Sequence, residues 1–433
     1  MNSWFYFLYN AIAIPAMQFG FSLAIPFNSK IRTGWKGRKH LYTELETVLK
    51  QHQGKAPRIW IHNSSMGEFE QAKPVIAAIK KRNPSSFILV SFFSPSGYEH
   101  AKTYQEADYL CYLPFDSRKN AKKFIETIAP DVAVVVRHDF WPNHLWTLRE
   151  MNIPAILINC SIGDGWRFRI RFLKRIERSL YQCFDHIFAV SQIAKERCER
   201  NHFNRGQVSV IGDTRYDQVV ARAEAKHDLV RHLIERKGNR VCLVLGSTWP
   251  GDESVIFTAL ERIDRTQYPL WLIVVPHEPT LEHLHKIENR LEAQGRTYKR
   301  LSEVKSADTQ PLDAIVVDSV GVLANLYALS DIAYVGGGFG VGVHSVLEPA
   351  AFGRIVIYGP HHRNSYEAIE MKEAGIGFSV ENADELYVLL FSLLEDQKQL
   401  SRLGEKAKKM VEQNLGATQK ITSFLCGLVE PPK

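Results

Sequence analysis

Residues 58–81 read RIWIHNSSMGEFEQAKPVIAAIKK: a short apolar run, a polar turn, and then apolar residues at helical spacing. Such a unit predicts a buried strand followed by a helix. Similar apolar runs, each followed by a helical pattern, recur at 87–93, 132–136, 155–159, 187–191, 241–247, 271–276, 314–319, 332–338 and 354–359. Apolar, β-branched strands that alternate with helices indicate a parallel sheet covered on both faces. The sequence therefore predicts two successive doubly wound, Rossmann-like α/β domains.

The 433 residues divide according to this pattern. The expected parts are an N-terminal segment at 1–40, a first Rossmann-like domain at 41–215, a linker at 216–240, a second Rossmann-like domain at 241–405 and a C-terminal helix at 406–433. The polar stretch 213–240 predicts the connection plus one helix, and the tail at 384–428 predicts two helices. Two α/β domains of similar size predict a ligand-binding cleft between them, at the carboxyl ends of their strands.

Composition narrows the partners of the chain. The formal net charge of +7 favours an anionic partner, which could be nucleic acid, phospholipid headgroups or a phosphorylated substrate. The six cysteines show none of the close spacings of zinc or thioredoxin-type sites. Reduced thiols in a cytosolic setting fit this pattern best.

Residues 4–27, WFYFLYNAIAIPAMQFGFSLAIPF, contain no charged side chain and exceed the roughly 20 residues needed to cross a bilayer. Basic residues follow at Lys30, Arg32, Lys36, Arg38 and Lys39. Such a flank predicts that the rest of the chain stays on the cytoplasmic side. Pro15 and Pro26 interrupt the run, so the segment either spans the membrane, lies in its interface, or packs on the protein as a hydrophobic hairpin. The first two alternatives place the protein at a membrane surface, and we expect the same of the third.

A glycine-rich loop follows the apolar run 332–335, in the sequence DIAYVGGGFGVGVHSVLEP at 331–349. Glycines allow backbone N–H groups to approach a phosphate, and a helix expected to begin near His344 would add its positive end. We predict a phosphate site that includes Gly336, Gly337 and Gly338. The alternative is a turn in which the glycines serve packing only. Glu348, one turn into that helix, is a candidate for the ribose hydroxyls or else a helix-capping carboxylate.

Further polar residues follow strands of the second domain. Ser247 and Thr248 lie in LGSTWPGDE, after its first strand, and could donate hydrogen bonds to a phosphate. His277 stands just past the next strand, where a ligand-binding residue and an ordinary loop histidine are both expected.

In the first domain, Ser65 and Glu68 occupy the turn between the strand at 58–63 and the helix that follows. A carboxylate at this turn faces the predicted cleft. The alternative is that Glu68 only complements the positive end of the helix.

Several segments, in order along the chain, resemble motifs of the 3-deoxy-D-manno-octulosonic acid (Kdo) transferases. HNSSMGE resembles their H-x-x-S-x-G-E, YLPFD their Y-L-P-Y-D and DFWPN their E-L-W-P-N. GDTRYD is similar to G-N-x-K-F-D, and GSTWPGDE to x-S-T-H-x-G-E-E. VVDSVGVLANLY resembles L-D-T-x-G-E-L-x-x-L-Y, GGGFGVGVHSVLEP resembles G-G-S-x-x-x-x-G-G-H-N-x-L-E-P, and YGPHHRN resembles G-P-x-x-x-N. The matches extend from the membrane segment to about Gly377, which is more specific than any one motif.

This resemblance implies a GT-B-type fold and an inverting, metal-independent transferase that moves Kdo from CMP-Kdo to a lipid A precursor. It implies Glu68 as catalytic base, Asp139 and Arg215 as charge-supporting residues, and no cofactor. It also implies a place at the cytoplasmic face of the inner membrane, in lipopolysaccharide biosynthesis. His344 and Ser345 correspond to the family's H-N pair in the donor-binding segment.

The sequence departs from the family pattern at three places. Arg137 replaces an acidic residue, Pro276–His277 lacks an intervening Arg, and Ser345 replaces Asn. A transferase or epimerase that uses a UDP-sugar, and a non-catalytic membrane-bound protein, therefore stay as alternatives. The retained SMGE segment argues against the non-catalytic one.

Basic and apolar residues interleave at 165–178, GWRFRIRFLKRIER. This pattern suits an anionic membrane surface or the phosphates of a glycolipid. It also fits an ordinary amphipathic helix with a solvated basic face. Since the sequence shows no nucleic-acid-binding module, we expect no nucleic-acid partner.

Overall fold

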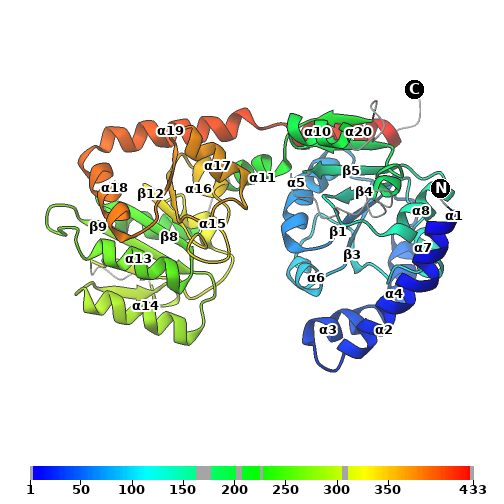
Figure 1. Ribbon diagram of the computed structural model, residues 1–433, viewed down its shortest axis with the longest axis horizontal. Coiled ribbons are helices and arrows are strands. Elements are labelled where there is room, and N and C mark those ends of the chain that lie inside the picture. The colour runs from blue at the N-terminus through cyan, green and yellow to red at the C-terminus, as the bar shows by residue number, and fades with distance from the viewer. Residues whose placement is uncertain (1–2, 162–176, 201–206, 225–227, 305–310, 430–433) are drawn as a thin grey trace. The chain divides into compact units, whose positions relative to one another are not determined.

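The computed structural model describes residues 3–161, 177–200, 207–224, 228–304 and 311–429. The chain divides into two compact units, Met1–Gln218 together with Leu415–Lys433 (unit 1) and Val219–Asn414 (unit 2). Each unit is built on one sheet of seven parallel strands with helices packed against it (Figure 1). The predicted pair of doubly wound α/β folds is thereby confirmed.

The sheet of unit 1 has the strand order β3-β2-β1-β4-β5-β6-β7. Its strands are β1 Arg58–Asn63, β2 Phe87–Phe92, β3 Tyr109–Tyr112, β4 Val132–Val136, β5 Ala155–Cys160, β6 His186–Ala189 and β7 Val208–Val210. Its helices include α3 Ser29–Gly37, α4 Leu41–Gln51, α5 Met66–Arg82, α6 Pro95–Ala101, α7 Arg118–Ile128, α8 Pro142–Glu150, α10 Gln192–Arg200 and α20 Ala417–Val429. Strand order reverses between β1 and β4, so their carboxyl ends flank the place where such sheets bind ligands.

The sheet of unit 2 has the order β10-β11-β9-β8-β12-β13-β14. Its strands are β8 Val241–Thr248, β9 Leu270–Pro276, β10 Tyr298–Arg300, β11 Ala314–Val316, β12 Ile332–Val335, β13 Ile355–Tyr358 and β14 Gly377–Ser379. Its helices include α12 Asp228–Lys237, α13 Pro250–Leu260, α14 Leu281–Ala293, α15 Leu323–Leu326, α16 Leu347–Ala351, α17 Tyr366–Glu373, α18 Ala383–Glu395 and α19 Gln397–Gln413. The corresponding reversal lies between β8 and β12.

Both faces of the first sheet are buried, as its uninterrupted apolar strands predict. Along β1, Trp60 packs into the core on one face, with Leu89 and Trp146. Its neighbour Ile61 packs into the core on the other face, with Phe69. Alternation of side chains along the strand thus supplies both cores from one apolar run.

The N-terminal segment is helical and packs along unit 1. It consists of α1 Ser3–Leu8, a π-helical turn Tyr9–Ala13 and α2 Ile14–Ala24 (Figure 1). The rings of Phe5, Tyr6 and Tyr9 lie 5.5, 5.0 and 5.7 Å from the ring of Trp146 on α8. The Tyr9 hydroxyl also donates a hydrogen bond of 2.7 Å to the buried carboxylate of Asp116. The beginning of this apolar segment is therefore anchored in the protein core.

Two predictions about helices are wrong. The tail at 384–428 forms three helices rather than two, because Asp396 interrupts the pattern. Its backbone ends α18, and its side chain accepts a hydrogen bond of 3.0 Å from the Gln399 N–H to cap α19. The stretch 213–240, predicted as a connection with one helix, holds two: α11 Thr214–Glu224 and α12. The last helix, α20, packs on α5 of unit 1.

Candidate active site

The turn between β1 and α5 holds the Glu68 carboxylate through the backbone. Its Oε2 accepts hydrogen bonds from the N–H groups of Ser64 at 2.7 Å and Ser65 at 2.8 Å, and the Ser65 hydroxyl lies 3.3 Å away. Glu68 is the third residue of α5 and Ser65 its N-cap, which is the capping-box arrangement. Within the part of the chain that the structure describes, no group donates to Oε1. One oxygen is thus fixed and the other is left for a further partner.

The surroundings of Glu68 raise its pKa above the ordinary glutamate value. Burial is the largest cause, because it disfavours the charged form. The negative charge of Asp139 acts in the same direction, whereas the Ser65 and Ser64 N–H groups and His62 oppose it. A carboxylate with a raised pKa is a stronger base, which suits proton abstraction from a hydroxyl.

Next to Glu68, a chain of hydrogen bonds links three neighbouring strands. His62, at the end of β1, has its Nε2 2.8 Å from Asp139 Oδ2 and its Nδ1 2.9 Å from the Ser91 hydroxyl of β2. Trp60 Nε1 donates to the same hydroxyl at 2.8 Å. These groups form a hydrogen-bonded relay at the reversal of strand order.

Asp139 keeps its negative charge through these contacts. His62 and the Trp141 N–H, at 3.1 Å, both hydrogen-bond its Oδ2. Burial is the largest influence and by itself raises the pKa of Asp139, but the hydrogen bonds and the charge of His62 outweigh it, so the net pKa is lowered. The predicted residues Glu68, Ser65 and Asp139 are therefore brought together. His62 and Ser91 complete the group, although the sequence prediction did not select them.

Arg215 sits in a local ion pair at the start of α11. Its Nε and Nη2 donate to Asp213 Oδ2 at 2.9 and 2.8 Å. A role of Arg215 toward a substrate stays a prediction.

In unit 2, the glycine-rich loop folds tightly against its neighbours. A Cβ on Gly336 would lie 2.2 Å from the backbone oxygen of Ser247, and one on Gly338 would lie 2.5 Å from the backbone nitrogen of Gly359. Gly337 has a φ of +91°, and a Cβ there would lie 2.3 Å from the oxygen of Gly342. These three positions therefore require glycine for close backbone packing, whether or not a phosphate binds there.

Two N–H groups of this loop, those of Gly337 and Phe339, are bound to the side chain of Asp252, at the start of α13. This fully buried carboxylate accepts hydrogen bonds from Gly337 at 2.8 Å and Phe339 at 3.3 Å, and from the Tyr334 hydroxyl at 3.2 Å. It also accepts one from the Trp249 N–H at 3.0 Å. An acidic side chain thus occupies donors that the sequence pattern offers to a phosphate, and the sequence prediction did not identify it.

The helix expected near His344 begins only at Leu347 and has five residues. The chain before it folds back on the strand end, because the His344 N–H donates to the oxygen of Gly336 at 3.1 Å. Ser345 lies exposed in the loop. Glu348 is the second helical residue rather than one turn in, and it pairs with Arg222 at 3.5 Å.

Two rings among the predicted donor residues stack on each other. The rings of His277 and His344 lie 4.5 Å apart with planes inclined by 16°, and the Trp249 ring lies 4.7 Å from that of His277. Trp249 Nε1 donates to His344 Nε2 at 3.2 Å, so that nitrogen is unprotonated. Burial lowers the pKa of His344, and the neighbouring His277 adds to this. His344 is therefore a neutral histidine whose Nδ1 carries the proton.

The hydroxyls predicted to bind phosphate differ in availability. The buried Thr248 donates its hydroxyl hydrogen to Glu253 Oε1 at 2.8 Å, so it is not a free donor. Ser247 is part-exposed and has a φ of +52°, which is uncommon for a residue with a side chain and occurs at functional sites.

A cavity of about 390 Å³ lies beside the glycine-rich loop of unit 2. It is lined by Gly340, Val341, Gly342, Pro360, His361, Arg363 and Asn364. Arg363 adds a positive charge, and Asn364 Nδ2 donates to the oxygen of Val343 at 2.9 Å, which ties the two loops together. The described residues contain no group of three His, Cys, Asp or Glu side chains that could hold a metal ion. Most of the basic segment 165–178 lies outside the described residues.

The architecture of two parallel α/β sheets has close counterparts among solved structures. It is similar to the UDP-GlcNAc 2-epimerase of Neisseria meningitidis, with a TM-score of 0.61 and 15% identity, covering 86% of this chain and 100% of that one. It is also similar to a glycosyltransferase of Rickettsia africae, with a TM-score of 0.57 and 14% identity, over 87% and 99%. At these identities the likeness defines the fold, which is of the GT-B-like class shared by glycosyltransferases and sugar-nucleotide epimerases.

Similarity in sequence distinguishes between these two kinds of enzyme and favours the glycosyltransferases. Residues 33–218 match the family described as 3-deoxy-D-manno-octulosonic-acid transferase. The Kdo transferases of Aquifex aeolicus and Haemophilus influenzae are 29% and 28% identical over 86% and 85% of this chain, and 94% and 86% of their own lengths. A bifunctional glycosyltransferase/methyltransferase of Fusobacterium nucleatum is 31% identical over 78% of this chain, which spans about half, 53%, of that protein. Residues 33–218 thus match the Kdo transferase family, and over most of its length the chain is similar to proteins named as Kdo transferases.

Proposed function

We propose that the chain transfers Kdo from CMP-Kdo to a hydroxyl of a lipid A precursor, with inversion, in lipopolysaccharide core biosynthesis. The observation that carries this proposal is the Glu68 carboxylate, fixed through one oxygen at the reversal point of the first sheet with its pKa raised. The relatives named as Kdo transferases support the choice of sugar. Their matches cover most of this chain, and the family match at residues 33–218 includes Glu68 and the relay.

The chemistry requires one base. Glu68 Oε1 takes the proton of the acceptor hydroxyl while the hydroxyl oxygen attacks the anomeric carbon of Kdo from the face opposite the leaving group. The bond from that carbon to the phosphate oxygen of CMP breaks, and its electron pair leaves with CMP, so a single displacement inverts the centre. Asp139, whose pKa is lowered, keeps a negative charge beside the base. General-base assistance of this kind typically contributes about 10²- to 10⁴-fold.

The donor is proposed to bind in unit 2, at the cavity beside the glycine-rich loop. Arg363 is suited to the donor phosphate or carboxylate, since guanidinium groups match both. The neutral His344 can donate a hydrogen bond from Nδ1 to the donor. Ser247, Ser345 and Glu348 stay as predicted contacts with the donor. Neither a metal nor a cofactor is needed for these roles, so EDTA should leave transfer unchanged.

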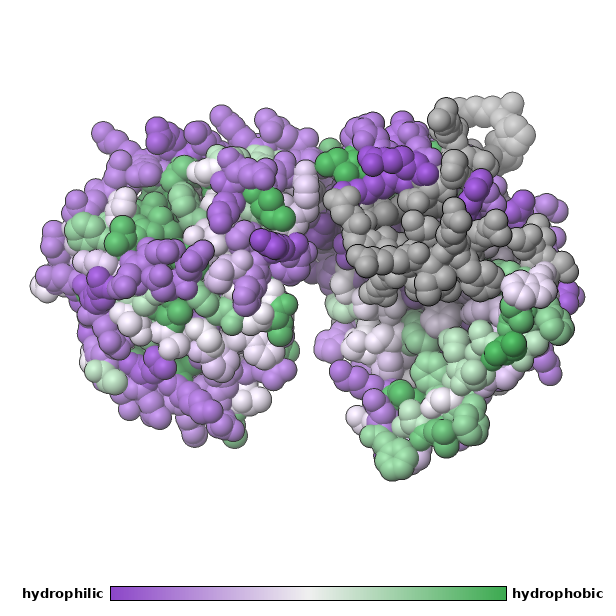
Figure 2. Space-filling model, in the orientation of Figure 1, coloured by the Kyte–Doolittle hydropathy of each residue, from purple (hydrophilic) through white to green (hydrophobic). Residues whose placement is uncertain are grey.

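We further propose that the N-terminal segment lies in the plane of the inner membrane, on its cytoplasmic face. By length and composition, Trp4–Ala24 is the one described helical run that could cross a membrane. Its outward side chains are exposed, and Figure 2 shows apolar residues gathered over these helices. The large exposed apolar residues from the start of this segment to Phe27 are Trp4, Phe7, Ile12, Met17, Phe19, Leu23 and Phe27.

Contacts at both ends of the segment support the in-plane arrangement over a spanning one. Tyr9 is bonded to Asp116 near its start, and the ring of Phe21 lies 5.5 Å from that of Phe115 near its end. A spanning helix would have to give up these contacts with unit 1. A helix held along the protein can instead place its apolar outer face in the interface.

Substitution of the outer face tests the membrane proposal without disturbing the core. Phe19→Ser with Leu23→Ser should reduce flotation of the full chain on anionic vesicles by tenfold or more, because burial of each side chain contributes roughly 1.5–3 kcal/mol. The control is Val388→Ser, an equally exposed apolar position in unit 2. Equal flotation of all three proteins would contradict the in-plane arrangement.

The activity is tested by incubating the full chain with CMP-Kdo and a lipid A precursor and measuring the mass of the product by mass spectrometry. We expect a mass increase of one or more Kdo residues. Transfer from a UDP-sugar, or epimerisation of one, in place of Kdo transfer would overturn the proposal.

A further inference from the structure

A second polar cavity, of about 290 Å³, lies at the other edge of the unit 2 sheet from the glycine-rich loop. Arg240 directly precedes β8, Arg296 stands two residues before β10, and Asp313 directly precedes β11. Arg265 lies in the turn that leads into β9. Because the strands are parallel, these starting points share the amino edge of the sheet, whereas the glycine-rich loop follows the carboxyl end of β12. The cavity is therefore separate from the proposed donor site.

The charges around this cavity do not balance. Three arginines line it with a single carboxylate, Asp313. That carboxylate accepts from Arg265 Nη2 at 2.9 Å and from the Thr297 N–H at 2.9 Å. Arg240 instead donates to backbone oxygens, among them that of Leu312 at 2.6 Å. Two positive charges are left without a carboxylate partner in the lining.

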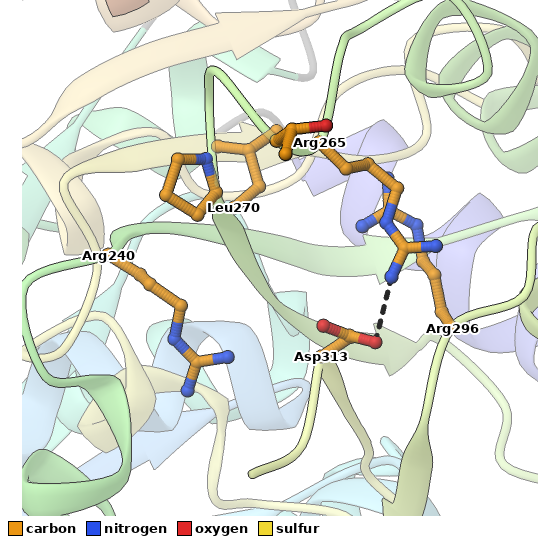
Figure 3. A pocket seen from close by; sticks show the side chains of 7 residues that line it. Arg240, Arg265, Leu270, Arg296 and Asp313 are labelled. Carbon is orange, nitrogen blue, oxygen red and sulfur yellow. Dashed lines mark hydrogen bonds and ion pairs between the residues drawn. The ribbon is translucent and has the colours of Figure 1, made fainter.

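Arg296 is the residue that these contacts leave unexplained. Its side chain is buried, with 4% of the residue exposed, and its Nε donates to Gln294 Oε1 at 3.0 Å. Its two terminal nitrogens have no acceptor among the described residues. Burial lowers its pKa to about 10, the charge of Arg265 acts in the same direction, and the charge of Asp313 opposes both. Figure 3 shows Arg265 and Arg296 on one side of the cavity and Arg240 across from them. A largely buried cation whose terminal nitrogens have no acceptor is costly.

We propose that this cavity is a binding site for a phosphate monoester, held by Arg296 with Arg240 and Arg265. Guanidinium groups bind phosphate oxygens with paired hydrogen bonds, and a phosphate would supply the acceptors that Arg296 lacks. The volume is at the lower end of the range of about 300–1,000 Å³ for small-molecule pockets. It suits a phosphate group carried on a small molecule. The site does not depend on the transferase proposal.

Titration calorimetry of the full chain with inorganic phosphate, at constant ionic strength, tests the site. Wild type should bind saturably, and Arg296→Gln should weaken binding by about tenfold or more. The matched control is Arg402→Gln, which removes the same charge from an exposed position on α19 and should bind like wild type. Absence of saturable binding, or equal affinity in Arg296→Gln, would overturn the proposal.

Thermal unfolding provides a second measurement, which distinguishes a phosphate-binding arginine from one that only supports the fold. In phosphate-free buffer, Arg296→Gln should melt no lower than wild type, because it removes a buried charge that the surrounding residues compensate only in part. Phosphate should raise the Tm of wild type and of Arg402→Gln, but not that of Arg296→Gln. A lower Tm of Arg296→Gln in phosphate-free buffer, with no effect of phosphate on wild type, would mean that Arg296 only supports the fold.

The source of the phosphate group is distinguished with vesicles of phosphatidylcholine, with or without phosphatidic acid. Equal flotation of wild type and Arg296→Gln assigns the site to a soluble phosphate ester. A loss confined to Arg296→Gln on phosphatidic acid assigns it to a lipid headgroup.

Discussion

The two sheets reverse strand order in the same way, yet the polar groups at their reversal points are used differently. In unit 1, two backbone N–H groups bind one oxygen of Glu68 and leave Oε1 for a further partner. In unit 2, the Gly337 and Phe339 N–H groups are already bound by Asp252. The first arrangement presents a reactive group, whereas the second builds a rigid support. A glycine-rich loop at a strand end is therefore not by itself a phosphate site.

The largest expected effect comes from Glu68→Gln. The amide keeps an oxygen for the Ser64 and Ser65 N–H groups but cannot accept the acceptor's proton. We expect transfer to fall by about 10²- to 10⁴-fold with CMP binding retained. Kdo transfer and Tm are measured on one preparation. Glu70→Gln, two residues further along α5, is the control and should stay active. If Glu68 only complements the helix, its variant would lose about 0.3–1 kcal/mol of stability and keep full turnover.

The second largest effect concerns Asp252, which holds the glycine-rich loop of unit 2. Asp252→Asn replaces one accepting oxygen by an NH2 group, so some of its four donors lose their partner. Each hydrogen bond to a buried charge contributes about 1.5–3 kcal/mol, so we expect the Tm to fall by several degrees. Asp384→Asn, on the surface of α18, should change stability by less than about 0.5 kcal/mol. An unchanged Tm in Asp252→Asn would show that the loop does not depend on this carboxylate.

Two glycine variants, Gly336→Ala and Gly340→Ala, test whether the glycine-rich loop serves close packing or phosphate binding. In Gly336→Ala the new Cβ would lie 2.2 Å from the Ser247 oxygen, and we expect a loss of about 1–3 kcal/mol. In Gly340→Ala the nearest atom is 4.0 Å away, so stability should hold or rise slightly. Calorimetric unfolding and CMP titration are run on both. Loss of CMP binding in Gly336→Ala at an unchanged Tm would favour a direct contact with phosphate over packing.

The sequence was sufficient for what depends on local pattern. Uninterrupted apolar runs predicted the sheets, and the turn before Glu68 predicted its place at a strand end. The relay could not be predicted, because His62, Ser91 and Asp139 meet only once β2, β1 and β4 lie side by side. The signal available was a polar residue, His62, ending the apolar run of β1.

In unit 2, the sequence was equally compatible with a phosphate-binding role and a packing role of the glycine-rich loop. Close approach of Gly336 to Ser247 and of Gly338 to Gly359 depends on the neighbouring strand ends, which no local pattern reveals. The start of α16 was placed three residues early for the same reason, since His344 bonds back to Gly336.

The smallest effect tests how the relay tunes the base. Burial raises the pKa of Glu68 most, and the charge of Asp139 adds to it. Because only ionised Glu68 can accept a proton, transfer should be lost as pH falls through that pKa. Asp139→Asn removes the charge while its amide oxygen can still accept from His62, so the acid limb should move to lower pH. The plateau rate should fall far less than in Glu68→Gln. The measurement is a pH profile of kcat/KM for wild type and Asp139→Asn, with Asp131→Asn, at an exposed residue just before β4, as the control. If the acid limb stayed in place, either Glu68 would not be the titrating base or Asp139 would not act on it, and the Glu68→Gln result would decide between these.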